Sequence, residues 1–358
     1  MEPDIEQLLN GPRGRRLCLE LAMEMDQDIR IAVFHLGYNL DPGAGRSRVL
    51  LTMNPSGEVP PPPPEPTVDE LAALIRSLDF RSITDELVQH ALQRAVDTAR
   101  YWQEPDGEDV LAAAPEIKNA LCHVAEGVLG TSAAESWTLE AEVRQWSIDW
   151  RSAGDPAPLA GNPRQKLAEW ARNQRSGEVR AAWERPADIR ANVGGEWWSI
   201  PHNLMQSTGQ IPQGLSLVED SLGWENATAI PVAGTGRILE IESAEVWIEL
   251  CRMFPLEVTA SRRHDWFRTT GRHGRWVIPD WERASSRWDA VHLPINGYLH
   301  LAGRALDVDP VEGTASVIAG WNPDTTFWLN DVVRESGEPR QHWHRPHNQD
   351  EWQLAAGG

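Results

Sequence analysis

The stretch "RWVIPDWERASSRWDAVHLPINGYLHLAG", residues 275–303, gathers side chains capable of acid–base chemistry. Asp280 ends one expected strand and Asp289 starts the next, and strand alternation puts His292 on the opposite face from its neighbours. Because strand ends converge on one rim of a sheet, a His–Asp pair there could act as general base and orienting carboxylate. The alternative for His292 is a core histidine bound to a backbone carbonyl. The candidate catalytic residues are His292, Asp280, Asp289 and Tyr298.

The same region carries a local surplus of positive charge in an acidic chain. The whole chain has a net charge of −20, yet eight arginines stand against four acidic residues between Arg262 and Arg304. The overall charge disfavours nucleic-acid binding. The local surplus could hold one anionic small molecule, because guanidinium forks match phosphate geometry. Alternatively, the arginine stems cover apolar surface. The candidate phosphate-binding residues are Arg263, Arg268 and Arg272.

Tryptophan is the most informative residue type in the composition. The chain has 18 tryptophans, and ten of them lie between Trp197 and Trp328. An indole buries a large area but needs a partner for its N–H, so these residues form either a core with polar tips or an aromatic pocket. Aromatic faces beside arginine and carboxylates suit nucleotides, nicotinamide and sugars. The candidate ligand-binding residues are Trp276, Trp281, Trp288 and His202.

Several other chemistries are disfavoured by the sequence. It has no G-x-S-x-G elbow, no phosphate-binding GxxxxGK[ST] loop and no GxGxxG after an expected strand. The three cysteines, at 18, 122 and 251, are too far apart in sequence to form a CxxC motif. The motif "HWHRPH", with histidines 342, 344 and 347, lies in a polar segment and is expected to bind no structural metal.

The sequence predicts an α+β protein in several parts, with an α-helical middle domain and a C-terminal α+β domain containing a mixed or antiparallel sheet. Strands are expected in 28–40 and 47–53. The five consecutive prolines at 60–64 favour a stiff spacer. Proteolysis near this spacer should release a stable fragment that begins at about Val68. The expected parts are a small N-terminal α/β unit (1–57), a Pro-rich linker (58–66), the helical domain (67–190), the Trp-rich α+β domain (191–335) and a loosely held polar tail (336–358).

Helix signals are clearest in the middle of the chain. Thr67 and Glu70 have capping-box spacing, and Pro115 and Gly130 have the residue types that start and stop a helix. A fourth helix is expected around 139–150 and a fifth from Asn162. Short strand-like runs such as "LSLVED" and "ATAIPV" dominate after residue 194, with helices expected at 243–254 and 280–288.

Three segments together resemble an uncharacterised protein family of high-GC actinobacteria: "DTARYWQEPDGEDVL", "WVIPDWERASSRWDAVHLPINGYL" and "SVIAGWNPDTTFWL". This resemblance implies a bacterial cytoplasmic protein. The segment "WWSIPHNLMQSTG" also looks like the first strand and Ser-Thr element of the ADP-ribosyltransferase fold, which would imply NAD as a ligand. The catalytic glutamate of that fold has no clear counterpart in "VHLPINGYLH".

Two functions are consistent with these patterns. The first is an enzyme that binds an anionic, nucleotide-like ligand in a Trp-lined cleft, with NAD as the cofactor candidate, for ADP-ribosyl transfer or N-glycosidic cleavage. The second is a non-catalytic module that docks a protein partner through its helices and Pro-rich linker. The acidic N-terminal segment lacks the features of a signal peptide, and no stretch is apolar enough for a membrane span, so a cytoplasmic protein is expected.

Overall fold

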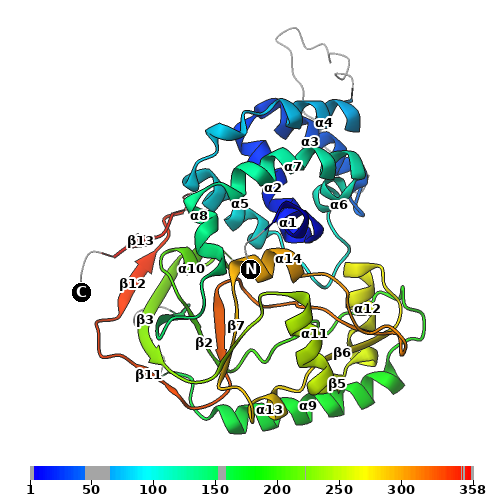
Figure 1. Ribbon diagram of the computed structural model, residues 1–358. Helices are drawn as coiled ribbons and strands as arrows, with labels where there is room; N and C mark the ends of the chain where they lie inside the picture. The colour runs from blue at the N-terminus through cyan, green and yellow to red at the C-terminus, as the bar shows by residue number, and fades with distance from the viewer. Residues whose placement is uncertain are drawn as a thin grey trace.

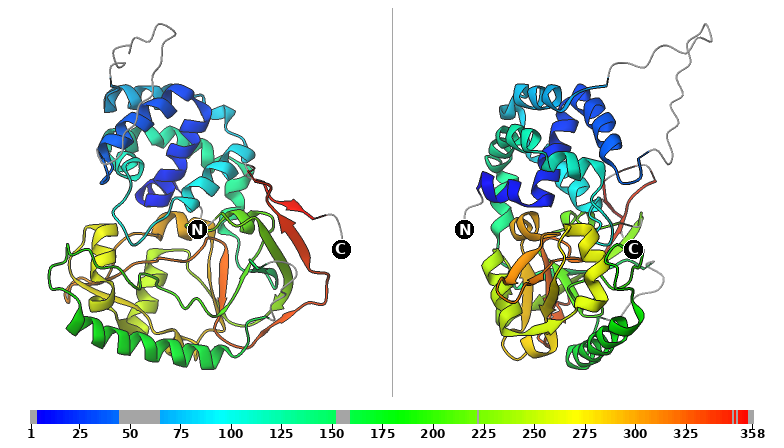
Figure 2. Two further views of the ribbon diagram at one scale, coloured as in Figure 1. Left: turned by 180° about the vertical axis from the view of Figure 1, so that it is seen from behind. Right: turned by 90° about the vertical axis from the view of Figure 1, so that its right-hand side faces the viewer.

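The computed structural model describes residues 4–44, 65–151, 159–221, 223–347, 349 and 351–355. Within these residues the protein belongs to the α+β class, as predicted. A layer of helices from the N-terminal third of the chain sits on a larger layer that contains the strands (Figure 1). Figure 2 shows the same two layers from behind and from the side. None of the described helices combines the length and apolar character that crossing a membrane requires.

The helical layer is built from segments on both sides of residues 45–64. Residues 45–64 lie outside the described residues, and with them the strand expected at 47–53 and most of the expected spacer. Its elements are α1 (Ile5–Asn10), α2 (Pro12–Met25), α3 (Gln27–Leu40), α4 (Val68–Ser77), the 3-10 turn η1 (Phe80–Ser82), α5 (Asp85–Asp97), α6 (Gly107–Ala113), α7 (Pro115–Leu129), α8 (Ser132–Glu135) and the 3-10 turn η2 (Ser136–Thr138).

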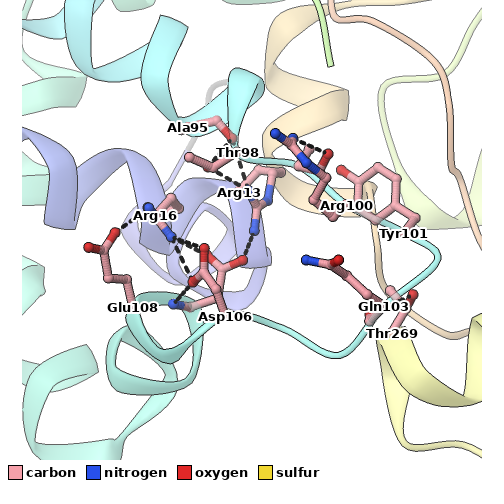
Figure 3. Close-up of polar contacts among 12 residues, drawn as sticks. Arg13, Arg16, Ala95, Thr98, Arg100, Tyr101, Gln103, Asp106, Glu108 and Thr269 are labelled. Atoms are coloured by element: carbon pink, nitrogen blue, oxygen red, sulfur yellow. Dashed lines mark hydrogen bonds and ion pairs between the residues drawn. The ribbon is translucent and has the colours of Figure 1, made fainter. Parts of the chain in front are cut away.

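Helix α2 is the centre of this layer and is buried along most of its length. It packs against α3, α5, α6 and α7, so helices from before and after residues 45–64 share one core. Two of its arginines, Arg13 and Arg16, are buried with it. Figure 3 shows both guanidinium groups among carboxylates of α6 and its N-cap, including Asp106 and Glu108.

The strand expected at 28–40 is wrong, because this segment is helix α3. Asp26 caps the helix by accepting hydrogen bonds from the backbone N–H groups of Asp28 and Ile29. Ile29, Ala32 and Val33 then repeat with helical spacing and are buried. By contrast, the helix signals at Thr67–Glu70 and at Pro115–Gly130 are confirmed by the capping box of α4 and by the bounds of α7.

The strands form two sheets within the described residues. They are β1 (Arg144–Asp149), β2 (Met205–Thr208), β3 (Asn226–Gly234), β4 (Ile238–Glu240), β5 (Pro255–Glu257), β6 (Arg275–Pro279), β7 (Ala290–Leu293), β8 (Leu306–Asp309), β9 (Thr314–Ser316), β10 (Thr325–Trp328), β11 (Val333–Glu335), β12 (Gln341–His344) and β13 (Gln353–Leu354).

The larger sheet has the order β13-β12-β3-β1-β2-β10-β7-β4, with β11 also paired to β3. All its pairs are antiparallel except β4 with β7, which are parallel, so the predicted mixed character is confirmed. The smaller sheet has the order β5-β6-β9-β8. Helices cover these sheets: α9 (Pro163–Glu184), α10 (Gln213–Ser216), α11 (Ala244–Met253), α12 (Thr259–Thr270), α13 (Trp281–Ala284) and α14 (Ile295–Leu301).

Three further expectations are corrected by the sheet. The fourth helix expected around 139–150 is instead strand β1, which pairs with β3 over its whole length, so Trp146 and Ile148 follow strand alternation. The run "LSLVED" contains the end of α10 and no strand. The tail expected to be loosely held contains β12, which pairs with β3 along 341–344.

Candidate functional site

His292 lies on β7 with its imidazole buried between two carboxylates. Its Nδ1 atom is 2.5 Å from Oε2 of Glu240, and its Nε2 atom is 3.3 Å from Oδ1 of Asp324. Burial disfavours the imidazolium ion, but the hydrogen bonds with Asp324 and Glu240 outweigh it and raise the pKa of His292 to about 9. At neutral pH the ring therefore holds its proton with both nitrogens engaged, which does not suit a general base.

The other three candidate catalytic residues have partners of their own. Asp280 caps α13 and pairs with Arg175 at 2.5 Å. Asp289 accepts hydrogen bonds from the backbone and guanidinium of Arg237 and from the Asn330 amide. The hydroxyl group of Tyr298 is 3.4 Å from that of Tyr101. Among the hydrogen bonds and ion pairs of the described residues, these three and His292 share no partner.

The three candidate phosphate-binding arginines are all engaged by protein oxygens. Arg263 donates to the backbone carbonyls of Arg185 and Pro186. Arg272 donates to two backbone carbonyls and lies over the ring of Trp276, with 4.9 Å between its guanidinium carbon and the ring centroid. Arg268 donates to two carbonyls and a carboxylate. Their positive charges are thus used to fix neighbouring chain segments.

The candidate aromatic residues divide between core and surface. Trp276 and Trp281 are fully buried, and the indole N–H of Trp281 donates to a backbone carbonyl. Trp288 is half-buried beside an arginine. His202 meets the ring of Trp198 edge-on, with 4.3 Å between ring centroids. These tryptophans are therefore mainly packing residues, and His202 borders a different aromatic group.

That group forms a cleft with a volume of about 510 Å³, here named the Trp cleft. Its walls come from four separate parts of the chain: the loop after α5, the loop after α9, the segment after α10, and α12. Figure 3 shows how Gln103 of the first loop lies beside Thr269 near the end of α12. The lining residues are Trp102, Gln103, Asn192, Gly194, Gly195, Trp197, Trp198, Asp220, Asp265 and Arg268.

Three half-exposed indoles form the aromatic wall of the Trp cleft. The ring of Trp197 lies 4.8 Å from that of Trp102 and 4.9 Å from that of Trp198, the latter pair being stacked. Offset and tilted contacts of this kind are favourable between aromatic rings. The result is a continuous row of flat apolar faces, part of which is open to solvent.

Buried donors hold this wall in position from behind. The indole N–H of Trp266 donates to the carbonyl of Trp197 at 2.9 Å, and Nε of the buried Arg262 donates to the carbonyl of Trp198 at 3.1 Å. Gly320 lies against the same wall with a φ of 72°. A Cβ atom there would meet Cδ1 of Trp198 at 2.2 Å, so only glycine fits.

Asp265 supplies the polar group of the Trp cleft. Its Oδ1 atom accepts a hydrogen bond of 2.5 Å from Arg268, which also donates to the carbonyls of Trp102 and Val193. Its Oδ2 atom is buried and has no hydrogen-bond partner among the described residues. Burial raises the pKa of Asp265, and the charge of Arg268 opposes this rise. A buried carboxyl oxygen without a hydrogen-bond partner, on the lining of a cleft, is where a polar group of a ligand can bind.

The Trp cleft is lined by other tryptophans than the three that the sequence analysis named as ligand-binding candidates. Of its candidate residues, Arg268 lines the Trp cleft, and Tyr298 lies behind it through its contact with Tyr101. Trp102, Trp197 and Asp265 were missed. The only local signal was the motif "GGEWW", in which two glycines precede adjacent tryptophans.

Comparisons with known proteins add no relatives to this picture: no protein-family model, curated protein or solved structure matches the chain.

Proposed function

We propose that the Trp cleft binds a nucleoside-type ligand, a flat heterocyclic base joined to a sugar, and promotes cleavage of its N-glycosidic bond. The observation that carries this proposal is the unpartnered Oδ2 atom of Asp265 beside the aromatic wall of Trp197. A base can stack on the indole faces while one of its nitrogen atoms accepts a hydrogen bond from the Asp265 carboxyl group, whose protonated form burial favours. The side-chain amides of Gln103 and Asn192 line the same cleft and supply donors and acceptors for sugar hydroxyls.

The charges favour the nucleoside part of a ligand such as NAD over its pyrophosphate. Arg268, the cation on the lining, is already bound to Asp265 and two carbonyls. Asp220 adds a second carboxylate, which pairs with Arg100 at 3.0 Å. A neutral or cationic ring fits this lining better than a diphosphate does, since a phosphate would lie beside carboxylates.

The two carboxyl groups have distinct roles in the proposed reaction. In N-glycosidic hydrolysis the bond between C1′ and the base nitrogen breaks, its electron pair goes to the base, and water adds its oxygen to C1′ and gives up one proton. Because burial favours its protonated form, Asp265 suits the acid that protonates a leaving adenine or uracil, and the proton given up by the water restores this acid. Nicotinamide leaves as a neutral ring and needs no acid. The Asp220 carboxylate then faces the positive charge that develops on the sugar ring.

The test is a titration of the purified protein with adenosine, uridine, nicotinamide riboside and NAD, followed by tryptophan fluorescence and by chromatography of the released base. We expect a nucleoside to change the emission, nicotinamide riboside to bind at least as well as NAD, and Asp265→Asn to abolish the release of adenine and uracil. Trp197→Phe should remove most of the fluorescence response. Trp183→Phe is the matched control, because Trp183 lies on α9, is 86% exposed and does not line the cleft.

Two outcomes would replace the proposal. A response to methyl glucoside and to none of the nucleosides would make this a saccharide site. If no ring ligand changed the emission, the interaction module would become the better hypothesis, with the exposed Val179 and Trp183 of α9 as its first surface to test.

A further inference from the structure

A buried carboxyl group, that of Glu219, lies where the helical layer meets the strand-containing layer. The backbone N–H of Glu219 donates to the side chain of Asn322 at 2.9 Å, which fixes the start of the segment between α10 and β3. Both carboxyl oxygens are shielded from solvent, and neither has a hydrogen bond of good geometry within the part of the chain that the structure describes. The groups that face them are the phenols of Tyr101 and Tyr298, the guanidinium of Arg13 and the backbone N–H of Gly320.

Arg13, the cation among these groups, already binds other partners. Arg13 binds Asp109 of α6 with one terminal nitrogen, and with the other it donates to the carbonyl of Ala95 at 2.9 Å and to Thr98. Figure 3 shows Arg13 in these contacts, with Tyr101 further along the loop that follows α5. Among the ion pairs of the described residues Glu219 has none of its own, and burial without one strongly disfavours its carboxylate form.

The protonation state follows from this environment. Burial raises the pKa of Glu219 to about 8, although the two tyrosines, Arg13 and Gly320 all favour the carboxylate. The pKa values of Tyr101 and Tyr298 are raised well above 10, chiefly by burial, so both phenols stay neutral where Glu219 titrates. As the pH rises, the Glu219 carboxyl group therefore loses its proton before either tyrosine does.

The surroundings of Glu219 connect it to the Trp cleft. The ring of Tyr101 is 6.4 Å from that of Trp197, and Gly320 lies directly against Trp198. The next residue in the chain, Asp220, lines the cleft. A change in the position of the Glu219 carboxyl group would therefore act on the aromatic wall from two sides.

We propose that the protonation state of Glu219 controls how the two layers pack against each other at the Trp cleft. As a neutral acid it packs between Tyr101 and Tyr298 and keeps the Trp wall in place. When it releases its proton to solvent, the carboxylate draws in water or shifts toward Arg13, and the wall moves with Tyr101 and Gly320. This inference concerns the ligand-free protein and does not depend on what the Trp cleft binds.

The experiment combines infrared spectroscopy with tryptophan emission between pH 6 and pH 9.5. We expect a protonated-carboxyl C=O band at pH 6 that Glu219→Gln lacks, and an emission change with a midpoint near 8 that the same substitution abolishes. Glu126→Gln, which alters an exposed glutamate of α7, is the matched control and should leave both signals unchanged. Persistence of the emission change in Glu219→Gln, or equal infrared bands in both proteins, would overturn the proposal.

A second variant decides the question if Glu219→Gln does not fold. The Tyr298 hydroxyl stabilises the Glu219 carboxylate, so Tyr298→Phe should move the emission midpoint to higher pH. A midpoint that stays in place would show that another group titrates. Because these readouts use the free protein, they can fail while nucleoside binding succeeds, and the reverse also holds.

Discussion

His292 and Glu240 face each other across the parallel pair of β7 and β4, with Nδ1 of His292 2.5 Å from Oε2 of Glu240. Asp324 closes the other side of the ring and also accepts hydrogen bonds from Thr208 and from the backbone N–H of Gly209. The imidazolium ion thus ties the edge strand β4 to β7, β10 and the end of β2. This arrangement stabilises the larger sheet and has a defined pH dependence.

We predict that this part of the stability is lost in alkaline solution. The folded-state pKa of about 9 lies above the ordinary value of 6.5, so the stabilisation is complete below pH 6.5 and disappears as the pH rises through 9. A shift of that size corresponds to about 3 kcal/mol. Urea unfolding of wild type and His292→Gln should differ most at pH 6 and least at pH 9.5. A difference independent of pH would contradict this explanation.

The glycine behind the Trp wall gives a second prediction. Gly320→Ala places a Cβ atom at 2.2 Å from Trp198 on a backbone with φ of 72°, so it should destabilise the fold by about 3 kcal/mol and shift the tryptophan emission. Gly313→Ala is the matched control, because Gly313 has φ of 64° and open space around it. The control should cost only the backbone strain, about 1 kcal/mol, with unchanged emission. Equal effects of both substitutions would argue against a tightly packed wall.

Local signals in the sequence predicted local structure well. The Thr67–Glu70 capping box and the Pro115 helix start depend on residues within one turn, and the structure confirms both. Segment 28–40 was misassigned because Ile29, Ile31 and Val33 also alternate like a strand. Its helical state is decided by packing of α3 against α2 and α6, which no local pattern reveals.

The Trp cleft was harder to predict for a similar reason. The residues that line it lie far apart in the chain, with 163 positions between Trp102 and Asp265. Only the tertiary fold brings them together with Trp197 and Asp220. The tryptophans of 275–303 were the more conspicuous cluster, yet Trp276 and Trp281 are needed to fill the core. The number of tryptophans therefore pointed to an aromatic pocket, but it did not show which tryptophans line it.

The ion-pair network in Figure 3 leads to a third prediction. Arg16 is buried and pairs with Glu20 of its own helix, with Asp106, and with Glu108 and Asp109 of α6. Arg16→Gln removes the positive charge and leaves partly buried carboxylates without it, so we expect a loss of about 3–5 kcal/mol in the free energy of unfolding. The measurement is urea denaturation at pH 7. Arg81→Gln, which breaks an exposed pair with Asp79, should change nothing measurable, and an equally small effect of Arg16→Gln would refute the prediction.

The fourth prediction concerns the chain on either side of residues 45–64. A specific protease site placed at 58–64 should give two pieces that stay together after cleavage, because α2 contributes Leu17, Cys18 and Leu21 to a core shared with α5 and α7. This differs from the stable fragment from Val68 expected from the proline run alone. Without α2, that fragment would expose the apolar faces of α5 and α7 to water.

Size-exclusion chromatography of the cleaved protein checks this directly, with an intact sample as control. The two pieces should co-elute in native buffer and separate in denaturant, and the melting temperature should fall by only a few degrees after cleavage because the contacts across the shared core remain intact. Expression of 68–358 alone should yield a protein with less helical signal per residue than the cleaved complex. If the C-terminal piece instead eluted alone with full helical signal and an unchanged melting temperature, α1 to α3 would be a separate domain, and the packing of α2 against α5 would contribute little to stability.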